Sequence, residues 1–236
     1  MTPMRVQGST RVSARRRTPP RPGERLARTL AALNARHPWS HNDHFHRWIL
    51  AHLPDRRRRA LDVGCGQGAL VATLSAHFAE VHGNDIDATM RRAAQDRSAG
   101  LANVTIHDGA WAAAGGEFDL VTMVAVLHHL AVPDALRDVC RLLAPGGRFL
   151  AVGLAPPRSL RDHLWEAASV VTNPLIGLAK HPRPSRGGPQ PDPFPVKDPT
   201  ISYDELRHLL DEAMPGAAMR HRLGFRHSIA WTKPPT

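Results

Sequence analysis

Three glycines, Gly64, Gly66 and Gly68, lie between a predicted strand over residues 60–63 and a predicted helix over residues 69–78. Glycine at such a turn lets the backbone bend sharply and approach a ligand with no Cβ atom in the way. The spacing also satisfies the dinucleotide fingerprint if Ala69 takes its last place. A plain turn without a ligand is the alternative, so the glycines alone leave the ligand open.

Three acids close three successive predicted strands: Asp62, Asp85 and Asp108. Asp62 would repel the pyrophosphate of a dinucleotide, whereas it would attract the sulfonium and ammonium groups of S-adenosylmethionine. Asp85 can accept hydrogen bonds from ribose hydroxyls in either ligand, and Asp108 can accept one from the adenine amine. Each acid alone could be a helix cap or a buried acid bonded to backbone N–H groups. Together they favour S-adenosylmethionine.

The elements that must position these residues alternate along the chain. Strands are predicted over residues 60–63, 80–84, 103–107, 117–124 and 148–154, and helices over 69–78, 88–97, 133–143 and 202–214. Residues 217–222 and 225–232 predict a closing antiparallel hairpin. The expected fold class is therefore α/β, a doubly wound and mostly parallel seven-stranded sheet with helices on both faces and a C-terminal antiparallel hairpin.

The span from about residue 53 to 154 resembles the class I, Rossmann-like S-adenosylmethionine-dependent methyltransferases, especially the small-molecule group with the LHHL signature. The matching stretches are ALDVGCGQGAL, VHGNDIDATM, NVTIHDG, FDLVTMVAVLHHL and LLAPGGRFL. The closing hairpin resembles that family's last two strands. The resemblance implies methyl transfer from S-adenosylmethionine, with S-adenosylhomocysteine as product, and it says little about the acceptor.

Carried over by position, the resemblance implies which residues bind the cofactor. The glycine turn would hold the methionine moiety, Asp85 the ribose and Asp108 the adenine. Ile86 and Met90 would pack on adenine, and Ala125 would lie near the methionine group. The full set is Asp62, Gly64, Cys65, Gly66, Gly68, Asp85, Ile86, Met90, Asp108, Gly109 and Ala125.

His128 and His129 follow the predicted strand at 117–124, at the edge where ligands bind in doubly wound sheets. One of them could act as a general base for a hydroxyl acceptor. The alternative is that both pack beneath the cofactor, because a position in a pocket does not make a base. A nitrogen or thiolate acceptor needs no base, since alignment alone can supply about 7–11 kcal/mol to a direct displacement.

Three histidines, His41, His44 and His46, lie within six residues before the first strand. His41 and His44 would share a helix face but His46 would not, so we expect no metal site. We expect residues 29–54 to form a helical lid that brings His41 and His44 to the acceptor pocket; a solvated helix start is the alternative. Trp165 is a further pocket candidate, with core packing as its alternative.

The net charge of +10 is concentrated in residues 1–28, which hold eight of the 31 basic residues and one of the 21 acidic ones. We expect this segment to be a disordered leader. Residues 55–236 are expected to form the Rossmann-like methyltransferase domain, with a proline-rich insertion at about 156–200 that contributes to the acceptor pocket. Cys65 and Cys140 fall in patterns typical of buried structure, which favours a reduced, cytoplasmic setting without disulfides.

The acceptor class follows from what the sequence contains and lacks. A small-molecule acceptor is the first expectation, with no nucleic-acid or membrane partner and the oligomeric state open. An RNA or protein methyltransferase that uses the leader as an electrostatic arm is the alternative, although no RNA-binding module or Asn/Asp-Pro-Pro-aromatic sequence is present. A dinucleotide-dependent reductase must accommodate Asp62 and lacks room for a substrate domain. A fold that retains the cofactor without chemistry is the last alternative.

Overall fold

The computed structural model describes residues 41–113, 115–154, 156, 200–222 and 226–235. Its strands are β1 (Arg59–Val63), β2 (Glu80–Asn84), β3 (Val104–His107), β4 (Phe118–Val124), β5 (Leu143–Gly153), β6 (Ala218–Arg222) and β7 (Arg226–Thr232). Its α-helices are α2 (His41–Leu50), α3 (Ala69–Leu74), α4 (Ala88–Ser98), α5 (Val132–Leu142) and α7 (Tyr203–Ala213), and two short 3₁₀ helices are η1 (Trp111–Ala113) and η2 (Leu127–His129).

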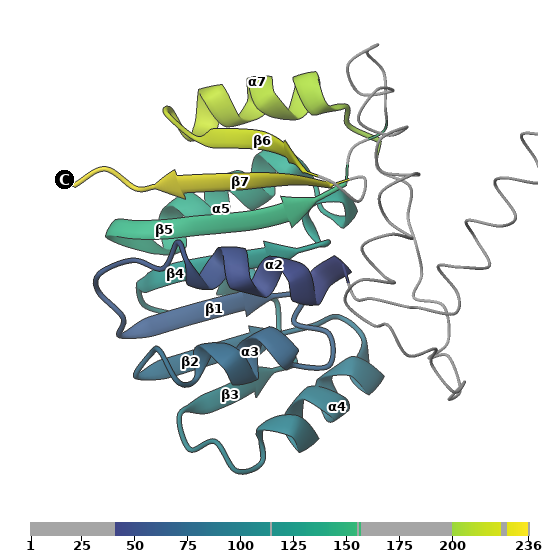
Figure 1. Cartoon of the computed structure of the whole chain (residues 1–236), viewed down its shortest axis with the longest axis vertical. Coiled ribbons are helices and arrows are strands. Elements are labelled where there is room, and N and C mark those ends of the chain that lie inside the picture. The colour runs from purple at the N-terminus through teal and green to yellow at the C-terminus, as the bar shows by residue number, and fades with distance from the viewer. Residues whose placement is uncertain (1–40, 114, 155, 157–199, 223–225, 236) are drawn as a thin grey trace, which may run out of the picture.

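The seven strands form one sheet in the order β3-β2-β1-β4-β5-β7-β6 (Figure 1). Strands β1 to β5 are parallel to one another, and β7 lies antiparallel to both β5 and β6. The predicted fold class is therefore confirmed, including the antiparallel pair that closes the sheet. None of the described helices is long and apolar enough to cross a membrane.

Two hydrophobic layers cover the two faces of the sheet, because neighbouring residues of a strand point to opposite sides. In β4, Leu120 packs into the layer formed with α2, α3 and α4, and Val121 packs into the layer formed with α5 and α7. Helix α5 shows the spacing that this requires, since its buried residues are Val132, Ala135, Leu136, Val139 and Leu142.

Side chains at the helix ends explain where several helices begin. Asp87 caps α4 by accepting hydrogen bonds from the backbone N–H groups of Thr89 and Met90. Ser202 and Glu205 form a capping box at the start of α7. These caps fix the first turns of helices that begin at the carboxyl edge of the sheet or beside it.

Two predicted boundaries were wrong. Helix α3 ends at Leu74 instead of residue 78, because the N–H groups of His77 and Phe78 both turn back to the Leu74 carbonyl. Strand β5 begins at Leu143 instead of residue 148. There Gly146 and Gly147 exchange backbone hydrogen bonds with Lys233, so the glycine pair lies within an irregular strand start.

Helix α2 covers the sheet face with its second half. Phe45 is 4% exposed and Ile49 is fully buried, and Ile49 joins the layer that contains α3. The first turn of α2 lies toward the carboxyl edge of the sheet (Figure 1). This part of the expected lid is thus a packed covering helix; residues 29–40 fall outside the described ranges.

A glycine in β2 tests how closely α3 packs on the sheet. A Cβ atom at Gly83 would lie 2.7 Å from Ile106 Cδ1 and 3.0 Å from Val71 Cγ2. Gly83→Ala should therefore lower the free energy of unfolding by about 1–3 kcal/mol through overpacking. Urea unfolding measures this, with Gly100→Ala as control because nothing lies within 4 Å of a Cβ atom there. Equal midpoints for the two variants would contradict the close packing.

Candidate cofactor and acceptor site

The glycine turn between β1 and α3 uses its glycines for two different reasons. Gly64, Gly66 and Gly68 have φ values of 67°, 52° and 76°, a region that favours glycine. A Cβ atom at Gly64 would lie 2.2 Å from Val126 Cγ2, and one at Gly68 would lie 3.0 Å from the Ala94 Cα atom. Nothing lies within 4 Å of a Cβ atom at Gly66. The outer glycines therefore permit close packing, and the middle one exposes backbone to a ligand.

Asp85, at the end of β2, holds this turn in place. Its Oδ2 atom accepts a hydrogen bond from the Gly66 N–H at 2.8 Å, and its Oδ1 atom accepts one from the Asp87 N–H at 2.9 Å. Each carboxylate oxygen keeps lone pairs for a further donor. Asp85 thus orients the turn and still faces the space beside it.

Cys65 contributes to the turn through its backbone. Its N–H donates to the Asn84 carbonyl at 2.9 Å, and its side chain is buried in the layer with α3. Burial raises the pKa of the Cys65 thiol to about 12, with further contributions from the charges of Asp62 and Asp85. The thiol is therefore a packing group. Both Cys65 and Cys140 are free thiols.

Asp62 lies in β1 beneath the turn and is 3% exposed. Its Oδ1 atom accepts a hydrogen bond of 2.6 Å from the Thr122 hydroxyl of β4. Burial raises the pKa of Asp62 to about 7; the Thr122 hydrogen bond opposes this shift and the Asp85 charge adds to it. A cation bound beside Asp62 would favour its ionised form.

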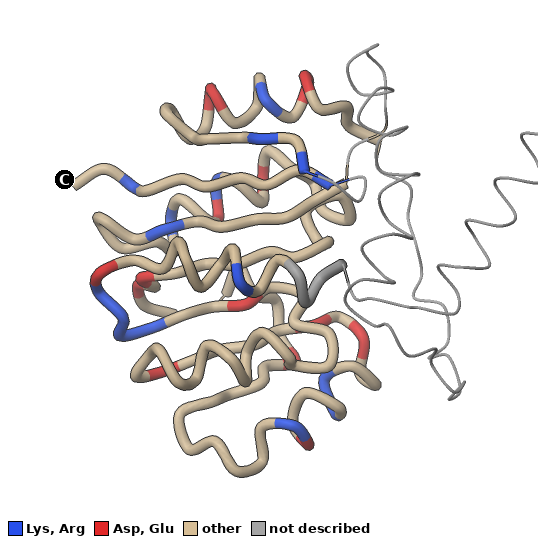
Figure 2. The backbone as a smooth tube through the Cα atoms, in the orientation of Figure 1, with Lys and Arg blue, Asp and Glu red and all other residues tan. Residues whose placement is uncertain are grey.

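The loops after β2 and β3 bring the remaining predicted residues to the same edge. Ile86 is 98% exposed, Met90 is half-buried, and Asp108 and Gly109 are exposed. A single exposed apolar side chain is ordinary on a protein surface and does not by itself indicate a ligand. Figure 2 shows acidic residues in the loop between β2 and α4 and basic residues in the helix that follows it.

Two residues that the sequence did not single out hold these loops. Asn84 donates from Nδ2 to the Gly109 carbonyl at 2.5 Å, which ties the end of β2 to the loop after β3. Arg91 donates to the carbonyls of Asp85 and Ile86, each at 2.8 Å. The sequence offered two signals for these contacts. Asn84 directly precedes the strand-end acid Asp85, and Arg91 follows it by six positions.

The residues after β4 connect the turn to the neighbouring pocket. Ala125 has a φ of 60°, and among the residues that the structure describes it is the one non-glycine residue with positive φ. Such a conformation costs about 1–3 kcal/mol. Its N–H donates to the Val152 carbonyl at 2.7 Å, and the next residue, Val126, packs against Gly64. The strained residue therefore aims Val126 at the turn.

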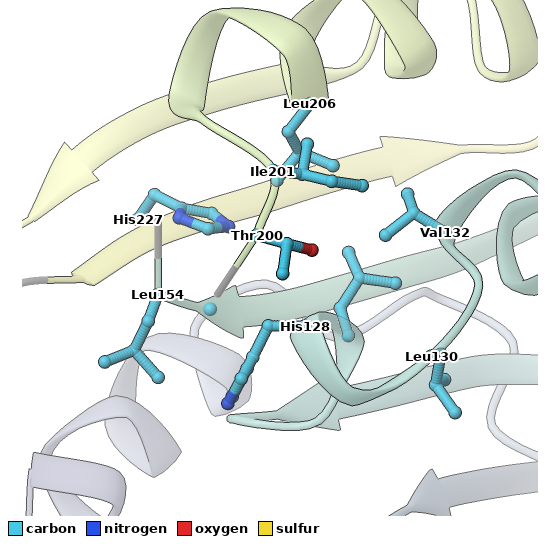
Figure 3. Close-up of a pocket in the computed structure, with 10 residues that line it drawn as sticks. His128, Leu130, Val132, Leu154, Thr200, Ile201, Leu206 and His227 are labelled. Atoms are coloured by element: carbon cyan, nitrogen blue, oxygen red, sulfur yellow. The ribbon is translucent and has the colours of Figure 1, made fainter. Parts of the chain in front are cut away.

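A pocket lies between η2, the end of β5 and the start of α7 (Figure 3). His128, His227 and Thr200 line it together with Gly153 and six apolar side chains: Leu127, Leu130, Val132, Leu154, Ile201 and Leu206. His128 is half-buried in this pocket, whereas His129 is exposed and is not among the lining residues. The two adjacent histidines thus differ in position.

The other predicted pocket residues, His41, His44 and Trp165, are not tested by the structure. His41 and His44 belong to the first turn of α2, but their side chains fall outside the described part of the structure, as does Trp165 entirely. Within the described ranges, no three histidine, cysteine, aspartate or glutamate side chains gather in a way that could hold a metal ion.

His227 is the pocket residue that sequence reasoning missed. It is the second residue of β7, and its side chain is 2% exposed. Burial lowers the pKa of His227 to about 3, and the charges of His221, Arg226 and His128 add to the effect. Its Nε2 atom is buried without a hydrogen-bond partner in the described structure, which costs about 1–3 kcal/mol.

The sheet order and the glycine turn define a Rossmann-like cofactor-binding domain, and comparison with known proteins gives its family. A family model described as a methyltransferase domain matches residues 61–151. An uncharacterized methyltransferase of Mycobacterium tuberculosis is 33% identical over 201 residues, which cover 84% of this chain and 98% of that protein. A ubiquinone biosynthesis O-methyltransferase of Thiobacillus denitrificans is 34% identical over 108 residues, 43% of this chain and 46% of that enzyme.

Solved structures show the same fold. The magnesium protoporphyrin IX methyltransferase of Synechocystis, solved with bound S-adenosylhomocysteine, superposes with a TM-score of 0.51 at 20% identity, covering 89% of this chain and 84% of that one. A protein of Pyrococcus horikoshii superposes with a TM-score of 0.56 at 18% identity, covering 81% and 88%. The chain belongs to the class I S-adenosylmethionine-dependent methyltransferases.

The buried Asp62 carboxyl should make stability depend on pH in a characteristic way. Its pKa is raised from 3.8 to about 7 on folding, so its stabilising contribution is complete below about pH 4 and is lost as the pH rises to about 7. Asp62→Asn should therefore become more stable relative to the parent protein over this interval, by up to about 1.4 kcal/mol per pH unit, and the difference should stay constant above it.

Urea unfolding at a series of pH values measures this difference in the absence of ligand. Asp96→Asn, at an exposed position of α4, is the matched control. A difference between Asp62→Asn and the parent that does not change between pH 4 and pH 7 would contradict a buried Asp62 with a raised pKa.

Proposed function

We propose that this chain transfers the methyl group of S-adenosylmethionine to a small-molecule acceptor by direct displacement. The observation that carries the proposal is that the glycine turn, anchored by Asp85, lies next to a largely apolar pocket. Val126 packs against Gly64 of the turn, and the next two residues, Leu127 and His128, line the pocket. A donor at the turn and an acceptor in the pocket would then be neighbours, as a displacement reaction requires.

The residues around the turn fit the proposed donor. Open space above Gly66 leaves room for a ligand against the backbone, and Asp85 keeps lone pairs for ribose hydroxyls. Ile86 would cover the adenine ring, and Asp108 and Gly109 would meet its edge. Asp62 would favour the positive charge of the methionine end. When bound, S-adenosylmethionine supplies a methyl group made electrophilic by its sulfonium.

On the acceptor side, His128 is the candidate base for a hydroxyl acceptor, because it lines the pocket and His129 does not. Residues 29–54 and the insertion at about 156–200 are proposed to complete the pocket. The names of relatives support a small acceptor, since they include a ubiquinone biosynthesis O-methyltransferase and a magnesium protoporphyrin IX methyltransferase.

Calorimetry with S-adenosylmethionine tests the donor site. Asp85→Ala removes the acceptor of the Gly66 N–H and the proposed ribose ligand, so the dissociation constant should rise at least about tenfold. Asp96→Ala, at an exposed position of α4, should bind like the parent protein. If the parent protein does not bind S-adenosylmethionine, the donor assignment is wrong. RNA methylation that is lost on deleting residues 1–28 would replace the small-molecule acceptor with the alternative.

A further inference from the structure

His227 enters the pocket because of a glycine on the neighbouring strand. Gly153, the last residue of β5, is its register partner in the antiparallel pair β5–β7. A Cβ atom at Gly153 would lie 2.6 Å from His227 Nε2 and 2.8 Å from its Cε1 atom. The imidazole therefore lies across the backbone of Gly153, and Figure 3 shows the ring directed toward the pocket.

The polar atom that His227 brings to the pocket is Nε2, and it is buried without a partner among the described residues. Buried polar atoms in folded proteins are mostly hydrogen-bonded, and an unpartnered one at the wall of a pocket can take its missing bond from a ligand or from water. Tyr203 packs its ring against the edge of the imidazole, with centroids 6.2 Å apart, which holds the ring in this orientation.

The rest of the described pocket lining restricts the charge of that ligand. No aspartate, glutamate, lysine or arginine lines it, and six of its ten residues are apolar side chains. Arg226 precedes His227 in β7 and so points to the opposite face of the sheet. Against the described lining residues, an anionic or cationic group would lose water without gaining a counter-charge. Burial also keeps the pKa of His227 low, so its imidazole is neutral, with one ring nitrogen that donates a hydrogen bond and one that accepts.

We propose that His227 is the acceptor-recognition residue of this methyltransferase, and that the acceptor is an uncharged, largely apolar molecule whose hydroxyl group hydrogen-bonds to His227 Nε2. The proposal rests on the function proposed above and adds the chemical class of the acceptor. It assigns recognition to His227 on β7 and leaves the role of base to His128 on η2. Gly153 is a positioning residue, because it acts only by making room for the imidazole.

Phenol and toluene are suitable probes, because they have nearly the same size and differ by a hydroxyl in place of a methyl group. Their dissociation constants would be measured by NMR titration of the full chain in the presence of S-adenosylhomocysteine. In His227→Leu, the ratio of the phenol constant to the toluene constant should rise about tenfold, the loss expected for one hydrogen bond in an apolar site. In the parent protein, phenol should also shift the ¹⁵N resonance of His227 Nε2.

Two further variants separate recognition from general effects on folding. Gly153→Ala leaves His227 in the chain but pushes its imidazole out of place. It should therefore raise the ratio of the phenol to the toluene dissociation constant, as His227→Leu does. His208→Leu removes an exposed histidine of α7 that pairs with Glu212, and it should leave the ratio unchanged.

The proposal is overturned if the ratio is the same in His227→Leu and the parent protein, if phenol leaves the Nε2 resonance in place, or if neither probe binds. S-adenosylmethionine binding, measured by calorimetry on the same samples, distinguishes the two levels of inference. Normal binding of S-adenosylmethionine with an unchanged ratio contradicts the role of His227 alone. Loss of S-adenosylmethionine binding by the parent protein contradicts the proposed function itself.

Discussion

The contact between Gly64 and Val126 is the constraint that joins the two halves of the site. Val126 occupies the space where any side chain at position 64 would lie, and Ala125 adopts a left-handed backbone conformation to place it there. The turn after β1 and the loop after β4 are therefore built as one unit. Asp85 bonds to the turn, and Asn84 beside it bonds to the loop after β3. On the other side, η2 follows Val126 and lines the pocket at the end of β5.

The same edge places two carboxyl groups close together before any ligand arrives. Asp62 is buried beside Thr122, and the charge of Asp85 raises the pKa of Asp62 beyond the effect of burial. A protein selected only for stability would place apolar groups here, because an uncompensated buried carboxylate is costly. The arrangement is explained if the protein gives up some stability so that the carboxyl groups are already oriented when a cationic ligand binds. The pocket follows the opposite rule, since its polar groups are few and uncharged.

The sequence predicted the fold well because strands and helices alternate with clear signals, and the glycine turn, Asp62, Asp85 and Asp108 stand at strand ends where local pattern is informative. It did not predict the short α3 or the early start of β5, since these depend on backbone hydrogen bonds to Leu74 and Lys233. It also missed His227. His227 reaches the pocket because antiparallel pairing places it opposite Gly153. The register between two strands that are far apart in the sequence cannot be predicted from the residues around either one.

The reversed direction of β7 has a consequence for how this protein can diversify. In a sheet of parallel strands only the ends of strands reach the ligand edge, whereas β7 brings its beginning there, so the hairpin near the C-terminus contributes a wall to the pocket. The donor half is built from β1, β2 and β3 and shares no strand with that wall. If this pocket holds the acceptor as proposed, substitutions in the hairpin can alter acceptor preference while the residues of the donor site stay unchanged.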